Sequence, residues 1–313
     1  MRDNLILSEK FRPKTVNECI LPEATKDQVN GLIASGNLQS LLFIGSAGVG
    51  KTTLARAIAN EIGADVLFIN ASLDGNIDTI RTSVMKFAST VSFTDSKKIT
   101  ILDEFDGATM VAQQSLRGII EEFSHNHTFI LTGNFVNKII EPIRSRCKII
   151  DFKIPSKDKP LIVAKFLKRL FSILESEKID YDKEAVAALV MKKYPDYRSI
   201  LNEIQGYSAG GRIDAGILAN LSDAVFDQLI TSLKNKKFSD IRKWVADNSD
   251  IESSDMFRMF YDSASDKLES KSIPELILQI GEFSYKDYFC VDKELNRIAF
   301  LTTLLMSSNI IWK

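Results

Sequence analysis

The sequence predicts an α/β domain built on a parallel sheet, followed by two helical domains. Up to about residue 154, short apolar runs alternate with segments of helical periodicity, which is the pattern of repeated strand–helix–strand units. Pro155 marks a boundary, and the pattern after it is helical. We therefore divide the chain into an α/β domain (residues 1–154), a small helical domain (155–224) and an all-helical C-terminal domain (225–313).

The segment Glu9–Pro13 precedes the first predicted helix and strand. Proline interrupts regular structure, so we expect an ordered arm that leads into the α/β domain. From these residues alone the arm either packs against the first helix or contacts a nucleotide base.

A glycine-rich loop joins the first predicted strand, Ser40–Gly45, to a helix whose apolar stripe begins at Leu54. Its glycines let backbone N–H groups turn inward around an anion, where a side chain would block the approach. Lys51 can then reach the β- and γ-phosphates, and the Thr52 hydroxyl can hold Mg²⁺. A chance glycine turn is the alternative, but every fixed position of the motif is met. The residues expected to bind a nucleoside triphosphate are Gly45, Ser46, Ala47, Gly48, Val49, Gly50, Lys51, Thr52 and Thr53.

Two adjacent carboxylates, Asp103 and Glu104, end the third predicted strand, Lys98–Glu104, after a second strand at Asp65–Asn70. In a phosphate-loop enzyme an aspartate at this strand end holds Mg²⁺ through its water shell. The adjacent glutamate can polarise the attacking water, which is the general-base role that hydrolysis needs. An Asp-Glu pair is common by itself, but after a complete phosphate loop it predicts a hydrolytic site.

The fourth and fifth strands are expected at Thr128–Thr132 and Lys148–Phe152, which gives a sheet with its ligand at the C-terminal ends of the strands. Asn134 stands just past the fourth strand, where its amide can orient water near a γ-phosphate. The alternative is that it only forms a turn with the preceding glycine. We expect His125 and His127 to be loop residues in a connecting turn and not metal ligands.

A helix expected over residues 77–93 carries an apolar stripe at helical spacing, which we interpret as its core face. Met85, Ala88 and Phe93 fall outside that stripe, near the helix end. Phe93 has polar neighbours, so it is a candidate exposed anchor for a partner, with a capping role as the alternative.

Two later helices carry polar residues of interest. Gln113 and Arg117, four residues apart in a helix expected over 109–123, share one face. A further helix opens after Pro195, with Asp196 as its plausible cap. Arg198 in this helix is either a surface charge or, in a small helical domain over a nucleotide, a contact to the γ-phosphate.

Composition and charge narrow the functional classes. The net charge is −1, so a nucleic-acid site must be a local basic patch and not a global field. Cys19, Cys147 and Cys290 lack metal-ligand spacing and are expected to be reduced thiols of a cytosolic protein.

The start of the chain is too charged for a signal peptide. The late uncharged run Ile298–Trp312 falls short of the roughly 20 residues that span a bilayer, so we expect a cytoplasmic protein. The first part of this run is apolar on most sides and is expected to be buried, either in its own domain or against a neighbouring subunit.

These motifs resemble those of the sliding-clamp loaders, which are AAA+ ATPases of the replication factor C small-subunit type. The resemblance is carried, in order, by Glu9–Pro13, the phosphate loop, Asp103-Glu104, Thr132-Gly133-Asn134 and Ser145-Arg146-Cys147. The run Ile139–Cys147 is especially specific to the family. The features most similar to the large subunit of the tailed-phage clamp loader are Asp103-Glu104-Phe105-Asp106, Phe87-Ala88-Ser89 and Pro195-Asp196-Tyr197-Arg198. The resemblance covers essentially the whole chain and is weakest after about residue 225.

The resemblance implies ATP and Mg²⁺ as cofactors, and a five-subunit ring or spiral with ATP at the subunit boundaries. For the phage type it implies four copies of this chain plus one dissimilar small subunit. Such an assembly opens a ring-shaped sliding clamp, places it on primer–template DNA and leaves on hydrolysis, thereby serving DNA polymerase indirectly. The three domains become an AAA+ nucleotide-binding domain, a lid and a collar for oligomerisation. For a phage protein, the compartment is the host-cell cytoplasm.

Carried over position by position, the resemblance assigns Mg²⁺ support to Asp103 and activation of water to Glu104. Arg146 becomes a finger inserted into the neighbouring subunit's site. The two sensors of the nucleotide are Asn134 and Arg198. The further residues expected to contact phosphate, Mg²⁺ or nucleotide are Lys51, Thr52, Arg12 and Ile20.

The resemblance also implies two contact surfaces. The end of helix 77–93 is expected to meet the clamp through Met85, Ala88 and Phe93. The residues expected to face DNA phosphates are Arg81, Lys86 and Arg117. Cellular relatives usually carry a basic residue just before the Ile-Asp that opens this helix, whereas this chain has Gly75-Asn76, so the resemblance does not carry DNA sensing to that position.

Two alternatives remain from the sequence. Another AAA+ machine, such as a helicase loader or branch-migration motor, lacks the Ser-Arg-Cys finger and this helical C-terminal third. A non-hydrolysing scaffold subunit is disfavoured by the intact Lys51, Asp103, Glu104 and Arg146. A small GTPase is excluded, because Asn137-Lys138 is not followed by the aspartate that reads guanine.

Overall fold

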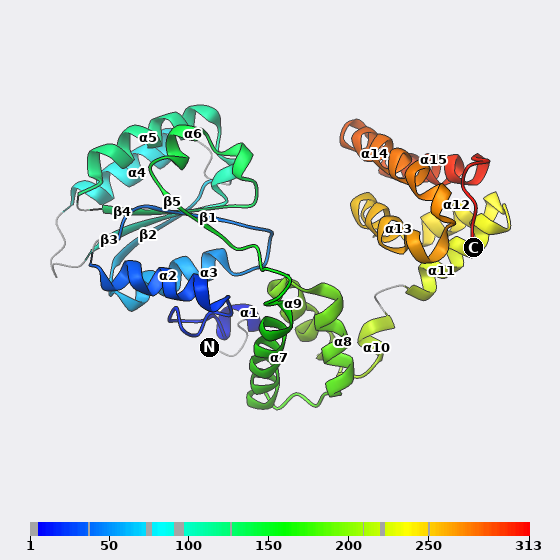
Figure 1. Cartoon of the computed structure of the whole chain (residues 1–313), viewed down its shortest axis with the longest axis horizontal. Coiled ribbons are helices and arrows are strands. Elements are labelled where there is room, and N and C mark those ends of the chain that lie inside the picture. Colours follow the sequence, from blue (N-terminus) through cyan, green and yellow to red (C-terminus); the bar gives the residue numbers. More distant parts are fainter. Residues whose placement is uncertain are drawn as a thin grey trace. The chain divides into compact units, whose positions relative to one another are not determined.

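The computed structural model describes residues 6–36, 38–72, 77–90, 97–125, 127–208, 210–219, 223–249 and 251–313. The chain divides into two compact units, one ending at Ile217 and the other beginning at Leu218 (Figure 1). The three cysteines are free thiols, as expected. In the part of the chain that the structure describes, no helix is long and apolar enough to cross a membrane.

The first unit is built on a five-stranded parallel sheet in the order β2-β3-β4-β1-β5 (Figure 1). The strands are β1 Leu41–Ile44, β2 Asp65–Asn70, β3 Lys98–Asp103, β4 His127–Gly133 and β5 Lys148–Asp151. All five expected strands are confirmed. The expectation for His127 is wrong, because this residue opens β4 and is 4% exposed. Its Nε2 lies 2.8 Å from the Thr100 hydroxyl of the neighbouring strand, which keeps one ring nitrogen satisfied inside the sheet.

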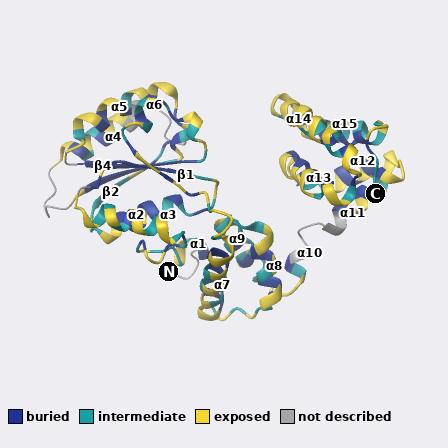
Figure 2. Ribbon diagram, in the orientation of Figure 1, coloured by how far each residue is buried: buried dark blue, intermediate teal, exposed yellow. Residues whose placement is uncertain are grey.

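Helices cover both faces of this sheet, so its central strands are buried runs of apolar residues (Figures 1 and 2). The covering helices are α2 Glu23–Ala34 and α3 Lys51–Glu61 on one face, and α4 Ile77–Ser89 and α5 Met110–Phe123 on the other. Along β1, Leu41 and Phe43 join the core under the first pair of helices, whereas Leu42 joins the core under the second pair. This alternation follows from the two-residue period of a strand. The short elements of this region are α1 Leu7–Lys10, η1 Phe105–Gly107, η2 Val136–Lys138 and α6 Glu141–Arg144.

A helical layer follows β5 within the first unit. Its helices are α7 Lys159–Ser176, α8 Lys183–Lys193 and α9 Tyr197–Ser208, and α10 Gly216–Ala219 comes next in the chain. The Asp196 cap is confirmed, because the Ser199 N–H donates to Asp196 Oδ1 at 2.9 Å. Residues 7–11 are tied to this layer by hydrogen bonds and by an ion pair between Lys10 and Glu177. The Leu7 N–H donates to Gln205 Oε1 at 2.8 Å, and Arg169 donates to the Phe11 carbonyl at 3.0 Å.

The second unit is built from helices, and an isolated antiparallel bridge pairs Leu268 with Trp312. Its elements are α11 Asp223–Lys234, α12 Phe238–Asp247, α13 Ser253–Lys267, η3 Ser270–Ser272, α14 Ile273–Phe289 and α15 Lys293–Met306. Phe300 of α15 is fully buried, and its ring centroid lies 4.9–5.6 Å from those of Phe257, Phe260 and Phe283. Phe300, Leu301 and Leu304 of the run 298–312 are therefore buried in their own unit, whereas Met306 of the same segment is exposed.

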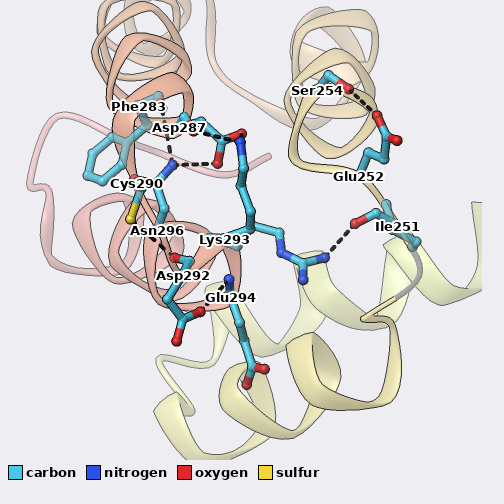
Figure 3. A network of polar contacts seen from close by, with 11 residues as sticks. Ile251, Glu252, Ser254, Phe283, Asp287, Cys290, Asp292, Lys293, Glu294 and Asn296 are labelled. Atoms are coloured by element: carbon cyan, nitrogen blue, oxygen red, sulfur yellow. Dashed lines mark hydrogen bonds and ion pairs between the residues drawn. The ribbon is translucent and has the colours of Figure 1, made fainter.

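Polar side chains join the end of α14 to the start of α15 (Figure 3). Asn296 donates to the Phe283 carbonyl at 3.2 Å and to Asp287 Oδ1 at 2.9 Å. The other carboxylate oxygen of Asp287 lies 2.8 Å from Lys293 Nζ. Asp287 therefore holds two side chains of α15, and these contacts keep the turn between the helices closed.

Candidate nucleotide-binding and hydrolysis site

A cavity opens at the carboxyl edge of the sheet, where the ends of β1, β3 and β4 meet the helical layer. Its wall includes the N-terminal arm, the phosphate loop and the starts of α3 and α9. Parallel strands bring their carboxyl ends to one edge, which is why residues far apart in sequence converge there. The predicted residues that line this cavity are Arg12, Ile20, Ala47, Gly48, Val49, Gly50, Lys51, Thr52, Thr53, Asp103, Glu104, Asn134 and Arg198.

Two glycines of the phosphate loop have left-handed backbone conformations. Gly48 has a φ of +72° and Gly50 a φ of +97°, and L side chains rarely adopt such angles. A Cβ added at Gly48 would also lie 1.8 Å from Asp196 Oδ1. The Tyr197 N–H donates to the Gly48 carbonyl at 3.2 Å. The loop therefore packs directly against the start of α9, and this contact brings Arg198 to the cavity.

Lys51 is the buried cation of the loop, with 8% of its surface exposed. Its ammonium donates to the carbonyls of Gly45 and Ser46, both at 2.7 Å, and to Asn134 Oδ1 at 2.8 Å. Burial lowers the pKa of Lys51, and the nearby Asp103 carboxylate partly offsets that shift. The structure thus brings together the predicted lysine and the predicted sensor amide.

Asp103 lies between two hydroxyls at the end of β3. Its Oδ1 accepts hydrogen bonds from Thr52 and from Thr132, both at 2.6 Å. Carboxylate and hydroxyl oxygens are the hard ligands that Mg²⁺ prefers, together with water and phosphate oxygens. The Thr52 oxygen keeps a lone pair for the metal while it donates to Asp103, so this donor set fits Mg²⁺.

Glu104 is exposed, and its backbone is left-handed, with a φ of 54°. Its N–H donates to the Thr132 hydroxyl at 3.1 Å. Its carboxylate accepts from the Ser72 hydroxyl at 2.6 Å and lies 3.5 Å from the Asn70 amide nitrogen. Sequence reasoning missed these three partners. No local pattern signals them, because the sheet register brings these residues together: Asn70 pairs with Asp103, and Leu131 pairs with Leu102.

Arg146 does not line the described cavity. It follows α6, where its Nε donates to Glu121 Oε1 at 2.8 Å and its Nη1 to the Pro142 carbonyl at 2.6 Å. The hydrogen bond from the Arg146 guanidinium lowers the pKa of the Glu121 carboxyl. In the single chain, Arg146 therefore forms a local ion pair with Glu121.

The residues expected to contact DNA lie on two neighbouring helices. Arg81 and Lys86 are exposed on α4, and Arg117 is exposed on α5. Gln113, four residues before Arg117, is 2% exposed and is held by the backbone around it. Its amide donates to the Ala108 and Lys138 carbonyls, and its oxygen accepts from the Ile140 N–H.

The residues expected to contact the clamp have different environments. Ala88 is 3% exposed, so the expectation of a contact surface there is wrong, because α4 turns this residue inward. Met85 is half-buried and packs against the core on this side of the sheet. Phe93 and Gly75-Asn76 lie outside the residues that the structure describes.

Two family models match the first unit. Residues 41–154 match the ATPase family associated with various cellular activities, and residues 158–219 match the AAA+ ATPase lid domain of sliding-clamp-loader large subunits. The second match covers α7 to α10, the helical layer over the cavity.

Similar proteins extend the match over both units. The chain is 35% identical to the sliding-clamp-loader large subunit of Enterobacteria phage T4, over 88% of this chain and 87% of that protein. It is 38% identical to the same subunit of Escherichia phage RB69, over 78% and 79%. It is 30% identical to the replication factor C small subunit of Thermofilum pendens, over 96% of each chain. Among solved structures, the Thermotoga maritima RuvB branch-migration motor superposes with a TM-score of 0.52 at 17% identity, over 73% of this chain and 80% of that one, a likeness of fold alone.

Proposed function

We propose, from the premise that this chain belongs to the sliding-clamp-loader family of AAA+ ATPases, that ATP binding and hydrolysis in the cavity drive the loading of a ring-shaped clamp onto primer–template DNA. The observation that carries the proposal is the convergence of Lys51, Thr52, Asp103, Glu104 and Asn134 at one sheet edge. Each supplies the group that phosphoryl transfer to water requires.

The residues divide the reaction between them. Lys51 holds the β- and γ-phosphates, and Thr52 and Asp103 hold Mg²⁺, which neutralises charge on the phosphate oxygens when it is bound. Glu104 orients the attacking water and takes its proton. Asn134 already bonds Lys51 and so lies where it can also meet the γ-phosphate. Arg198, held at the cavity by the contact between Gly48 and α9, supplies a second cation.

The proposal gives Arg146 a role in a neighbouring subunit's site. Its present partner, Glu121, has a half-exposed side chain, and exposed ion pairs contribute little to stability because water and salt screen them. Such a pair exchanges readily for a more strongly charged partner. A triphosphate at a subunit boundary is a partner of that kind, because several negative oxygens converge there.

Two surfaces of the α4–α5 layer serve macromolecular partners in this proposal. Arg81, Lys86 and Arg117 face DNA phosphates, a contact that suits junctions of any sequence. The end of α4, with Met85 and Phe93, meets the clamp. The assembly holds four copies of this chain and one dissimilar subunit, joined through the second unit as a collar.

The test is the ATPase rate of the reconstituted assembly, measured alone, with clamp, with primed DNA, and with both. We expect the fastest turnover with both ligands, because each completes part of the active geometry. Labelled clamp should become topologically linked to closed circular primed DNA only when hydrolysable ATP is present. A rate indifferent to clamp and DNA would favour another AAA+ machine, and an absence of turnover would favour a scaffold subunit.

A further inference from the structure

Glu104 has a backbone conformation that glutamate seldom adopts. Its φ of 54° is in the left-handed region, at the first residue after β3. For a residue other than glycine, asparagine or aspartate, this conformation is strained and persists only where surrounding contacts impose it. Two hydrogen bonds hold this backbone: the Glu104 N–H donates to the Thr132 hydroxyl at 3.1 Å, and the Glu104 carbonyl accepts from the Gly107 N–H at 2.9 Å. Of the two, only the first comes from a side chain.

The Thr132 hydroxyl is itself fixed in direction. Thr132 is 1% exposed, and its hydroxyl donates to Asp103 Oδ1 at 2.6 Å. A hydroxyl has one proton, so donation to Asp103 leaves its lone pairs for the Glu104 N–H. One buried side chain therefore links the carboxylate that supports Mg²⁺ to the backbone of the residue that activates water.

We infer that Thr132 is a positioning residue for hydrolysis: its hydroxyl sets the backbone direction of Glu104 relative to Asp103. This inference rests on the proposed ATPase function and adds a residue to its machinery. Without the hydroxyl, the Glu104 N–H loses its acceptor. The backbone conformation that orients the Glu104 side chain is then no longer held. Ser72 still bonds the Glu104 carboxylate, so the side chain stays in the site but away from its working position.

The test compares Thr132→Val with Thr132→Ser. Valine keeps the shape and removes the hydroxyl, and serine keeps the hydroxyl. We expect Thr132→Val to lower kcat by about 10- to 100-fold, the range that a small misplacement of a catalytic group can cost. The KM for ATP should change little, because Lys51 and Thr52 remain. Thr132→Ser should recover most of the rate.

Thr128→Val is the matched control. Thr128 lies on the same strand, is 7% exposed and donates its hydroxyl to the Leu38 carbonyl at 2.8 Å, away from the cavity. It therefore repeats the loss of a buried threonine hydroxyl without touching Asp103 or Glu104. We expect it to lower thermal stability about as much as Thr132→Val while leaving kcat unchanged.

A second readout does not depend on turnover. The Glu104 amide hydrogen should exchange faster in Thr132→Val than in the wild type or in Thr132→Ser. If exchange at Glu104 is unchanged, or if kcat falls equally in both valine variants, the inference is overturned. A rise in KM at constant kcat would also overturn it, because the hydroxyl would then act through Asp103 alone. A wild type without ATPase activity would instead contradict the proposed function, and the exchange comparison would still decide the role of the hydrogen bond.

Discussion

The carboxyl edge of the sheet and the α12–α15 region both bury polar side chains, but they use them in opposite ways. At the sheet edge, Asp103 bonds the hydroxyls of Thr52 and Thr132, and Lys51 bonds the Asn134 amide oxygen; all three of these partners line the cavity. In the second unit, Arg297 is 5% exposed and donates to the carbonyls of Asn248 and Ile251, just after α12. The partners at the sheet edge can also bond a ligand in the cavity, whereas the carbonyls that Arg297 bonds cannot.

Buried polar groups therefore have different roles in the two units. Arg297 is a buried donor to carbonyls beyond a helix end, so its removal should cost stability. The site residues bond one another, so a phosphate can replace one partner without leaving a buried atom unpaired. Substitutions at the sheet edge should change turnover, and substitutions in the second unit should change the free energy of unfolding.

The largest effect is expected from Arg146→Ala. A guanidinium inserted at a phosphoryl-transfer site is worth about 10³–10⁵ in rate, so assemblies of this variant should bind ATP and barely hydrolyse it. Assemblies of Lys51→Ala should fail for want of ATP. Mixed assemblies should recover activity, because some boundaries pair an intact loop with an intact arginine.

Glu121→Ala is the control for Arg146, since it breaks the local pair and keeps the guanidinium. It should leave the rate near that of the wild type. A lack of recovery in verified mixed assemblies, or an equal loss in Glu121→Ala, would show that Arg146 acts only within its own chain.

The next effect is expected from Glu104→Gln. Loss of the carboxylate should slow hydrolysis by about 10²–10⁴-fold, the range that a general base supplies, with ATP affinity barely changed. The variant should accumulate bound to clamp and DNA, and its melting temperature should match the wild type. Single-turnover hydrolysis and ATP titration measure the two quantities, and loss of ATP binding would contradict the assigned role.

His127 is a buried polar residue at the amino end of β4, and its titration can be tested. Burial lowers the pKa of its imidazole to about 4, from an ordinary value of 6.5. The unfolded chain therefore binds more protons than the folded one between these values. Above pH 6.5 the ring is neutral in both states, so its burial carries no protonation penalty. As the pH falls from 6.5 toward 4, the free energy of unfolding decreases, by at most about 3 kcal/mol.

His127→Gln should remove this part of the pH dependence. The stability difference between the variant and the wild type, from urea unfolding followed by circular dichroism, should shrink as the pH falls from 7.5 to 4.5. A difference that stays constant over that range would mean that His127 is not buried as a neutral ring.

Arg297→Met should destabilise the second unit by about 1–3 kcal/mol, because carbonyls just past α12 lose their donor. Both tryptophans of the chain, Trp244 and Trp312, belong to this unit, so their fluorescence reports its unfolding alone. Arg258→Met is the matched control, since Arg258 forms an exposed pair with Asp262 four residues along α13. Equal losses in the two variants would contradict the distinction between the two regions.

The smallest effect is expected from Lys86→Ala on α4. DNA binding should weaken evenly across sequences, and the slope of log affinity against log salt should flatten by about one phosphate contact. Fluorescence anisotropy over a salt series, with primer–template junctions of different sequence, measures both. An unchanged slope would remove Lys86 from the DNA surface.

The sequence by itself determined the features that depend on neighbouring residues. The strands followed from short apolar runs, the phosphate loop from its glycines beside Lys51, and the start of α9 from its cap at Asp196. Each rests on local chemistry: side-chain period, backbone freedom and a hydroxyl, amide or carboxylate within a few residues.

Only the tertiary structure decided which distant groups meet. The Thr132 hydroxyl reaches Glu104 from 28 residues away, and Ser72 reaches it from 32 residues away on the other side. Gln113 is a polar residue on α5, and Ala88 is a small residue on α4. Their burial depends on how these helices pack against the sheet. Periodicity reports how a segment repeats along its own axis. Register between strands and the rotation of a helix on a sheet are set by contacts at long sequence separation, which no local pattern contains.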